Sequence, residues 1–127
     1  MPPNTTLILI PTYNECSNVL LLASALLELD LEADILFVDD GSPDGTGEIL
    51  DQLSEQQDRV EVMHRKQKSG LGSAYKAGFT QSINKGYEVT VCMDADFSHD
   101  PADLPRFIHL LKEKDMVGGS RYMKDGG

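Results

Sequence analysis

Two aspartates separated by one residue, Asp94 and Asp96, are the sharpest chemical signal in the sequence. Side chains at positions i and i+2 of an extended chain project to the same side, so both carboxylates can face one ligand. Such a pair can hold a hard divalent cation, which in turn binds substrate phosphates while keeping several waters. A triplet of this kind is often a solvated loop, but this one directly follows an apolar run. We therefore predict a metal site at Asp94 and Asp96.

A second acidic pair, Asp39-Asp40, also closes an apolar run. A carboxylate in this place can accept hydrogen bonds from a ribose hydroxyl or from a nucleobase N–H. Either aspartate could instead cap the helix that follows, although Ser42 competes for that role. We expect one member of the pair to contact a ligand and the other to be structural, and the residues alone leave open which is which.

Four further side chains are weaker candidates. The ring of Tyr13 could stack on a nucleobase or turn into the core, and both interpretations stay open. His99 could act as a base or a third metal ligand, but a lone histidine before a helix cap is more typical of local structure. Lys66 and Lys68 could contact a diphosphate, although charged loops are usually just solvated.

A glycine pair, Gly70 and Gly72, superficially resembles a dinucleotide-binding fingerprint. The third glycine of that pattern is missing, because Tyr75 stands three positions after Gly72. No Gly-Lys-Ser/Thr sequence follows a glycine at the spacing of a P-loop. The sequence therefore argues against a nicotinamide-dependent dehydrogenase and against a P-loop NTPase.

The elements that carry these residues alternate between two hydrophobic periods. Apolar runs predict strands over residues 7–10, where Pro11 is expected to end the strand, and over 35–38, 60–63, 89–93 and 116–119. Helical spacing predicts helices over residues 19–27, from a Ser42-Pro43 cap to 53, over 71–83 with Gly86 as its end, and from an Asp100-Pro101 cap to 111.

The fold predicted from this order is α/β. Strands that are apolar throughout, rather than alternating, are typical of a parallel sheet with helices on both faces. In open sheets of this kind, ligands bind beyond the carboxyl ends of the strands. Both acidic pairs follow strands directly, so we expect them at one edge of the sheet.

Composition narrows the classes of function. The chain has 127 residues, which suits one domain, and its net charge of −10 lacks the basic footprint of a nucleic-acid-binding protein. The same charge argues against attachment to an anionic bilayer by charge alone. Cys16 and Cys92 do not form a disulfide framework or a metal-ligand spacing, which fits a reducing compartment. No signal peptide and no apolar run of about 20 residues is evident, so we expect a cytoplasmic location. We interpret the loop-like Gly126-Gly127 ending as a sign that the chain is part of a longer protein.

Five segments together resemble the motif series of dolichol-phosphate, or polyprenyl-phosphate, mannosyltransferases. These enzymes belong to the inverting glycosyltransferase family 2 and have a Rossmann-like GT-A fold. The resemblance covers essentially the whole chain in register. Its segments are residues 11–15 (Pro-Thr-Tyr-Asn-Glu), 38–46, 68–75, 93–99 and 119–122.

The resemblance implies a role for each matching residue. Asp94 and Asp96 would hold Mg²⁺ or Mn²⁺, and with Ala95 they would lie along the donor diphosphate. Asp96, acting through the metal, would be the essential catalytic residue. Arg121 would face the donor phosphates or the acceptor phosphate. The guanosine would be surrounded by Pro11, Tyr13, Glu15, Val38 and Asp40.

The activity implied by the resemblance is transfer of mannose from GDP-mannose to dolichyl or polyprenyl phosphate, in a single in-line displacement that inverts the anomeric carbon. Residues 1–127 would form the nucleotide-sugar-binding portion of the GT-A domain, with the acceptor-binding part absent, so these residues alone would transfer little sugar. Membrane contact, at the cytoplasmic face, would come from the missing C-terminal part or from a separate partner.

Three other functions fit parts of the sequence. The nearest is a family-2 transferase that uses UDP-glucose or another nucleotide sugar with a polyprenyl-phosphate acceptor. Another is a non-catalytic nucleotide-binding module of the same fold. The third is a response-regulator-like domain, which leaves the Asp94 and Asp96 pair without a purpose and lacks the lysine expected after the fifth strand.

Overall fold

The computed structural model describes residues 5–29, 33–66, 71–95, 101–106, 108 and 121–122, with only the backbone of residues 71, 121 and 122. Its strands are β1 (Thr6–Thr12), β2 (Ala33–Asp39), β3 (Val60–His64), β4 (Val89–Cys92) and β5 (Arg121–Tyr122). Its helices are α1 (Val19–Glu28), α2 (Thr46–Gln56) and α3 (Leu71–Lys85), followed by the 3₁₀ turn η1 (Pro101–Asp103). Within these residues, no helix combines the length and apolar character needed to cross a bilayer.

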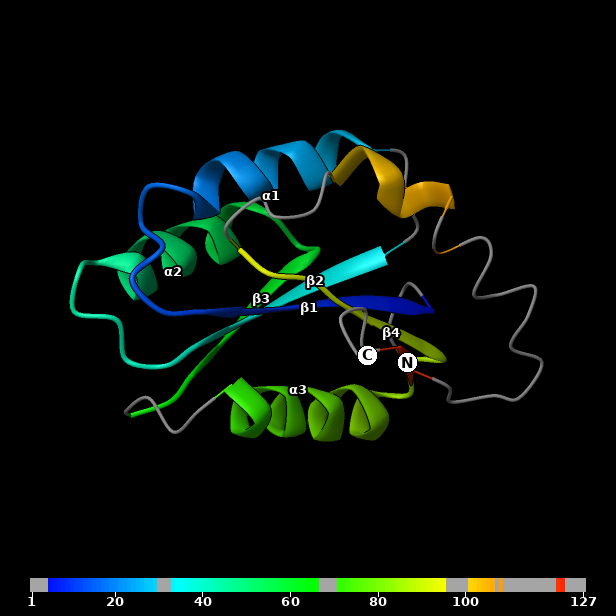
Figure 1. The fold of residues 1–127 in the computed structure, drawn as a ribbon. Coiled ribbons are helices and arrows are strands. Elements are labelled where there is room, and N and C mark those ends of the chain that lie inside the picture. The colour runs from blue at the N-terminus through cyan, green and yellow to red at the C-terminus, as the bar shows by residue number, and fades with distance from the viewer. Residues whose placement is uncertain are drawn as a thin grey trace.

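The strands form one parallel sheet in the order β3-β2-β1-β4-β5. Helices α1 and α2 cover one face, together with the η1 segment, and α3 covers the other (Figure 1). The predicted α/β architecture, with helices on both faces of a parallel sheet, is therefore confirmed.

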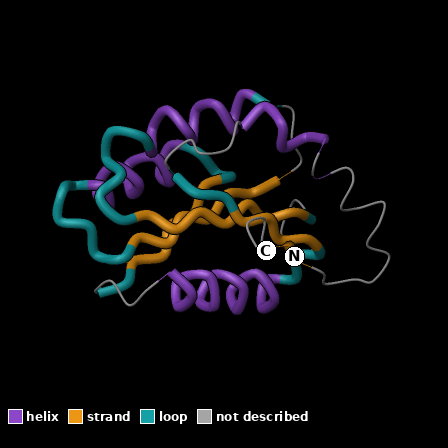
Figure 2. The backbone as a smooth tube through the Cα atoms, viewed as in Figure 1, coloured by secondary structure: helices purple, strands orange, loops and turns teal. Residues whose placement is uncertain are grey.

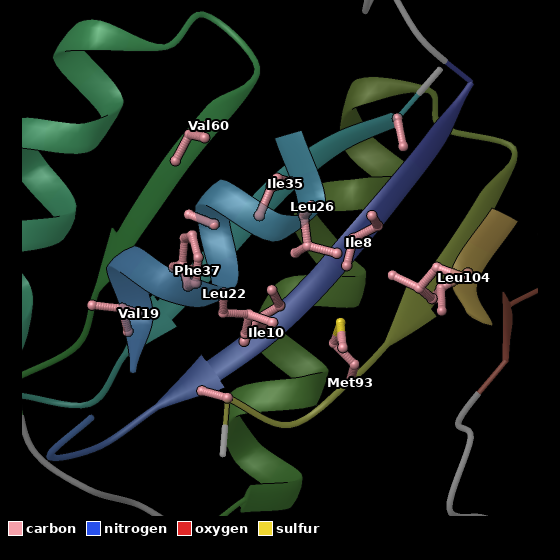
Figure 3. Close-up of a cluster of buried hydrophobic side chains, with 14 of the residues drawn as sticks. Ile8, Ile10, Val19, Leu22, Leu26, Ile35, Phe37, Val60, Met93 and Leu104 are labelled. Atoms are coloured by element: carbon pink, nitrogen blue, oxygen red, sulfur yellow. The ribbon is translucent and has the colours of Figure 1, made fainter. Parts of the chain in front are cut away.

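Both faces of the sheet are buried, which explains why the strands are apolar throughout. Successive side chains of β1 point to opposite faces, so that Ile8 and Ile10 pack toward α1 while Leu7 and Leu9 pack toward α3. Leu22 and Leu26 of α1 meet the first pair (Figure 3). The apolar side chains of the strands therefore form two layers, one on each side of the sheet.

Strand β1 does not end at Pro11, as the sequence had suggested, but continues to Thr12. The backbone carbonyl of Leu9 accepts a hydrogen bond from the N–H of Met93 at 3.1 Å, and that of Thr12 accepts one from Asp40 at 3.1 Å. Successive residues direct their backbone polar groups to alternate neighbours, so Pro11 faces the β4 side. Pairing with β4 stops at Leu9, so the proline costs the ladder no hydrogen bond.

Helix α2 begins at Thr46, and the predicted Ser42-Pro43 cap is wrong. The hydroxyl of Ser42 donates to the carboxylate of Asp39 at 2.7 Å instead of capping a helix. The N-cap position is Gly45, with φ +93°, and Asp44 accepts the N–H of Thr46 at 3.0 Å.

The later predictions have mixed outcomes. Helix α3 ends before Gly86, whose φ is +88°, as expected. Residues 116–119, predicted as the fifth strand, lie outside the described residues, as does Asp100. The described fifth strand is β5, in which Arg121 pairs with Thr90 and Tyr122 with Val91.

Candidate functional site

The order of the strands reverses at β1, which has β2 on one side and β4 on the other. In doubly wound sheets, the crevice beyond the carboxyl ends at this reversal is where ligands bind. The loops that follow β1 and β2 lie beside each other at this edge (Figure 2). Both acidic pairs follow strands of this central group, so the candidate site lies where the topology places ligands.

Asp39 is the structural member of its pair. Its side chain is 2% exposed. Its carboxylate accepts hydrogen bonds from the Thr12 hydroxyl at 2.8 Å, the Ser42 hydroxyl at 2.7 Å and the Ser42 N–H at 3.1 Å. These bonds link the ends of β1 and β2, so Asp39 holds the rim of the site together.

Asp40 faces a different partner. Its carboxylate lies 3.3 Å from Nε of Arg65, the first residue after β3. The backbone N–H of Arg65 donates to the carbonyl of Asp39 at 2.8 Å. Nη2 of the Arg65 side chain donates to the hydroxyl of Ser73 in α3 at 2.6 Å. Asp40 is therefore held by an arginine that also joins the ends of β2 and β3 to α3.

Gly41 explains how closely these segments approach. Its φ is +72°, a backbone conformation that residues other than glycine rarely adopt, and a Cβ there would lie 2.8 Å from the backbone oxygen of Lys66. Lys66 contributes this close backbone contact while its side chain is exposed. The turn after Asp40 therefore requires glycine on two grounds.

Backbone donors of the loop after β1 are paired with side chains of the loop after β2. The N–H of Asn14 donates to the Ser42 hydroxyl at 2.9 Å, and that of Glu15 to the Thr46 hydroxyl at 3.0 Å. The N–H of Cys16 donates to the Asp44 carboxylate at 3.2 Å. The two motifs thus form one polar unit at the rim.

The electrostatics of this unit follow from the same hydrogen bonds. The hydroxyl of Thr46 is the main cause that lowers the pKa of Asp44 to about 2. In return, the hydrogen bond to Asp44 is the largest influence that raises the pKa of the Cys16 thiol. Asp44 therefore stays ionised, and Cys16 protonated, over the ordinary pH range.

The residues expected around a nucleoside lie around this rim with different exposure. Tyr13 is 36% exposed and Pro11 is half-buried. Glu15 stabilises the turn that leads into α1, because its carbonyl accepts the N–H groups of Asn18 and Val19 and its side chain accepts the Asn18 amide.

Val38 differs from the other expected nucleoside contacts. Its side chain is 0% exposed and packs in the cluster that faces α3. Its backbone in β2 lies opposite Pro11, so any contact of Val38 with a ligand would have to come from the backbone.

Asp94 lies at the end of β4 and is half-buried. The hydroxyl of Tyr75 in α3 donates to it in a long hydrogen bond of 3.4 Å. Ala95 points the opposite way, buried in the cluster that faces α1. Asp94 thus projects toward α3 while Ala95 contributes packing.

Several predicted residues lie outside the described part of the chain: Asp96, His99, Lys68 and Gly70, together with the side chain of Arg121. Among the residues that are described, no three His, Cys, Asp or Glu side chains gather in a possible metal-binding group. Asp94 still offers the hard oxygen ligands that Mg²⁺ and Mn²⁺ prefer, at the ligand edge of the sheet, so it fits its half of the predicted pair.

Two contacts at this edge were missed by reasoning from the sequence. Arg65 directly follows β3, so the rule that residues after parallel strands face the ligand places it at this edge, but no sequence pattern indicated its pairing with Asp40. Tyr75 contacts Asp94 through its hydroxyl although its ring is buried in the core. Its apolar helical spacing concealed that role.

The comparisons with known proteins agree with one family. The family model described as Glycosyl transferase family 2 matches residues 7–127. The chain is 47% identical over 127 residues to polyprenol monophosphomannose synthase of Mycolicibacterium smegmatis, covering 98% of this chain and 48% of that protein. It is 46% identical over 120 residues to undecaprenyl-phosphate mannosyltransferase of Micrococcus luteus, covering 94% and 49%. The chain thus spans about half the length of these curated relatives.

Solved structures share the fold. The crystal structure of Staphylococcus aureus TarS 1-349 matches with a TM-score of 0.70 and 21% identity, covering 86% of this chain and 32% of that one. Mannosyltransferase PcManGT from Pyrobaculum calidifontis, solved with GDP-Man and Mn²⁺, matches with a TM-score of 0.57 and 19% identity, covering 64% and 26%. The predicted GT-A fold is thereby confirmed, and the match over residues 7–127 shows that this chain belongs to glycosyl transferase family 2.

Proposed function

We propose that residues 1–127 form the nucleotide-sugar-binding portion of an inverting mannosyltransferase that transfers mannose from GDP-mannose to dolichyl or another polyprenyl phosphate. The observation that carries this proposal is the 46–47% identity, over nearly the whole chain, to two proteins named for mannosyl transfer to polyprenols. The acceptor site and the membrane contact, at the cytoplasmic face, belong in this proposal to other parts of the protein or to a partner.

The described rim supports a donor site. Asp40 presents a carboxylate at the end of β2, where it can accept N–H groups of the guanine edge. Tyr13 lies in the loop that follows β1, which is hydrogen-bonded to the loop that follows Asp40. It is 36% exposed and offers a ring on which a base can stack. Asp94 offers carboxylate oxygens at the end of β4, where the diphosphate would lie.

In the proposed reaction, an oxygen of the lipid phosphate forms a bond to the anomeric carbon as the bond from that carbon to the GDP oxygen breaks. The lipid phosphate is already anionic at neutral pH, so no residue of this chain has to remove a proton. A divalent cation, when bound, supplies a Lewis acid that stabilises the charge on the departing diphosphate. Asp94, with Asp96 as its proposed second ligand, would hold that cation.

The decisive experiment is a calorimetric titration of the protein with GDP-mannose and with UDP-glucose, each in Mn²⁺ and in EDTA. We expect GDP-mannose to bind in Mn²⁺ and to bind much more weakly in EDTA. Asp94→Asn removes one metal-binding charge and is expected to weaken binding in Mn²⁺ roughly 10-fold or more.

The matched control is Asp58→Asn, the same loss of charge at an exposed turn that precedes β3, at the opposite end of the sheet. It should bind GDP-mannose as the unaltered protein does. Preference for UDP-glucose would contradict the mannosyl donor and would favour a related family-2 transferase. Equal binding in Mn²⁺ and EDTA would contradict the metal site and would favour a nucleotide-binding module without catalysis.

A further inference from the structure

The start of α3 contacts, directly or through one arginine, acidic residues that follow two different strands, Asp40 after β2 and Asp94 after β4. Ser73 accepts a hydrogen bond from Nη2 of Arg65 at 2.6 Å, and Nε of the same arginine lies 3.3 Å from the Asp40 carboxylate. Two residues further along α3, the hydroxyl of Tyr75 donates to Asp94 at 3.4 Å. One turn of helix therefore connects the ends of β2 and β4.

From these contacts we propose that the first turns of α3 act as a positioning element for the donor, in which Ser73 orients Asp40 through Arg65 and Tyr75 orients Asp94. The inference rests on the proposed roles of Asp40 and Asp94 in binding the donor. It gives a purpose to the Gly-Leu-Gly-Ser-Ala-Tyr segment at 70–75, whose pattern fits neither a dinucleotide fingerprint nor a P-loop.

Burial restrains the Arg65 and Asp40 end of the arginine branch, while Ser73 itself is exposed. Asp40 is 5% exposed, and the Arg65 side chain is largely buried. A guanidinium offers five N–H donors in a fixed planar arrangement, so fixing Nη2 at Ser73 also fixes the direction of Nε at Asp40. Within the described residues, Nη1 of Arg65 is buried and has no hydrogen-bond partner.

The tyrosine branch depends on the core. Tyr75 is 5% exposed, and its ring packs with Ala74 and with Leu9 and Cys92 of the neighbouring strands. A ring held in this way can move its hydroxyl very little. The hydrogen bond to Asp94 is long, which is common in sites without ligand and leaves the carboxylate able to turn toward a cation. Tyr75 therefore restricts one metal-binding carboxylate without neutralising it.

The chain contains a matched tyrosine for the test. Tyr87 is also buried and its hydroxyl also donates to an aspartate, Asp34, but at the amino ends of the strands. Tyr75→Phe and Tyr87→Phe therefore remove the same atom from the same kind of pair at opposite edges of the sheet. A purely structural tyrosine should behave like Tyr87 in binding experiments.

The experiment titrates GDP and UDP, in parallel, into the whole protein in Mn²⁺ and in EDTA, with the melting temperature of each variant measured separately. For Tyr75→Phe we expect affinity for the preferred nucleotide to fall roughly 10-fold in Mn²⁺ and to stay unchanged in EDTA, as for an outer partner of a metal ligand. For Tyr87→Phe we expect a lower melting temperature with unchanged affinity in both conditions.

The arginine branch has its own signature. Ser73→Ala and Arg65→Gln should weaken nucleotide binding several-fold in Mn²⁺ and in EDTA alike, since Asp40 is proposed to contact the base and not the metal. Ser73→Thr keeps the hydroxyl and should restore the affinity. Thr80→Ala, which removes another hydroxyl from the exposed side of α3, is the control.

The inference is overturned if Tyr75→Phe binds nucleotide like the unaltered protein, or if its loss is the same in EDTA as in Mn²⁺. Unaltered binding by Ser73→Ala and Arg65→Gln would overturn the arginine branch. A preference for UDP over GDP would instead count against the mannosyl donor, and the variants would still be compared with the nucleotide that binds.

Discussion

Asp39 and Asp40 show how environment divides two identical side chains. Asp39 accepts three hydrogen bonds from Thr12 and Ser42 and is committed to holding two loops together. Asp40, one residue later, points to Arg65. Alternation along the strand end turns them to different neighbours, so the first joins two loops and the second pairs with Arg65.

Asp39→Asn tests the structural role. The asparagine amide retains one acceptor oxygen, but its NH₂ group replaces the other. That NH₂ group is a donor and would face the donors of Thr12 and Ser42. We expect the free energy of unfolding to fall by about 1–3 kcal/mol, the usual cost of a buried polar group that loses its partners. Chemical denaturation measures this change. A loss no greater than that of the exposed Asp58→Asn would contradict the role.

The Asp44 carboxylate predicts a response to acid. Its pKa in the folded protein is lowered to about 2 from the ordinary 3.8, so its contribution to stability is complete above about pH 4 and is lost as the pH falls toward 2. Melting temperatures recorded between pH 7 and pH 2.5 should therefore decline more steeply for the unaltered protein than for Asp44→Asn. Parallel curves would show that the hydrogen bonds of the Asp44 carboxylate, first of all the one from Thr46, contribute nothing to stability.

At the scale of elements, α3 must lie close to β1 for its first turns to reach the site. Gly78 makes this approach possible, because a Cβ there would lie 2.3 Å from Cδ1 of Leu9. Leu9 is itself fully buried, and close packing in a protein core opposes a shift of its side chain. At Gly72, near the start of the same helix, a Cβ would meet nothing within 4 Å.

The two glycines give a matched pair of substitutions. Gly78→Ala should destabilise the protein by about 1–3 kcal/mol through overpacking against Leu9. Gly72→Ala should leave stability unchanged or raise it by up to about 1 kcal/mol, since alanine is the better helix former. Denaturant unfolding curves compare them directly. Equal effects at both positions would mean that α3 does not pack on β1 at Gly78 as closely as described.

At the scale of the whole molecule, an acidic chain is proposed to bind an anionic donor. The net charge is −10, so long-range electrostatics oppose a diphosphate, and attraction has to come from local groups such as a bound cation. Binding should therefore depend on the metal more strongly than it would in a basic protein.

This dependence can be followed through stability. A ligand that binds only the folded state stabilises it by about 2.7 kcal/mol at a concentration 100 times its Kd. We expect GDP with Mn²⁺ to raise the melting temperature clearly and GDP with EDTA to raise it little. Differential scanning calorimetry with each component alone supplies the controls. A shift that survives EDTA in full would contradict a cation-mediated site.

Much of the fold was determined by the sequence alone. The apolar runs of β1, β2, β3 and β4 and the helical spacing of α1 and α3 are local patterns, and burial on both faces is what such patterns require. The rule that ligands bind beyond the carboxyl ends of parallel strands then located the acidic pairs at one edge. Family resemblance added the donor and the metal as expectations.

Only the tertiary structure decided which residue does what at that edge. Asn14 and Ser42 are 28 positions apart, and Tyr75 and Asp94 are 19 apart. Contacts at such separations depend on how strands and helices pack, which no local pattern encodes. For the same reason, the sequence predicts a helix cap at Ser42, whereas in the structure the Ser42 hydroxyl donates a hydrogen bond to Asp39. Periodicity determines which elements form, and packing determines which polar side chains meet.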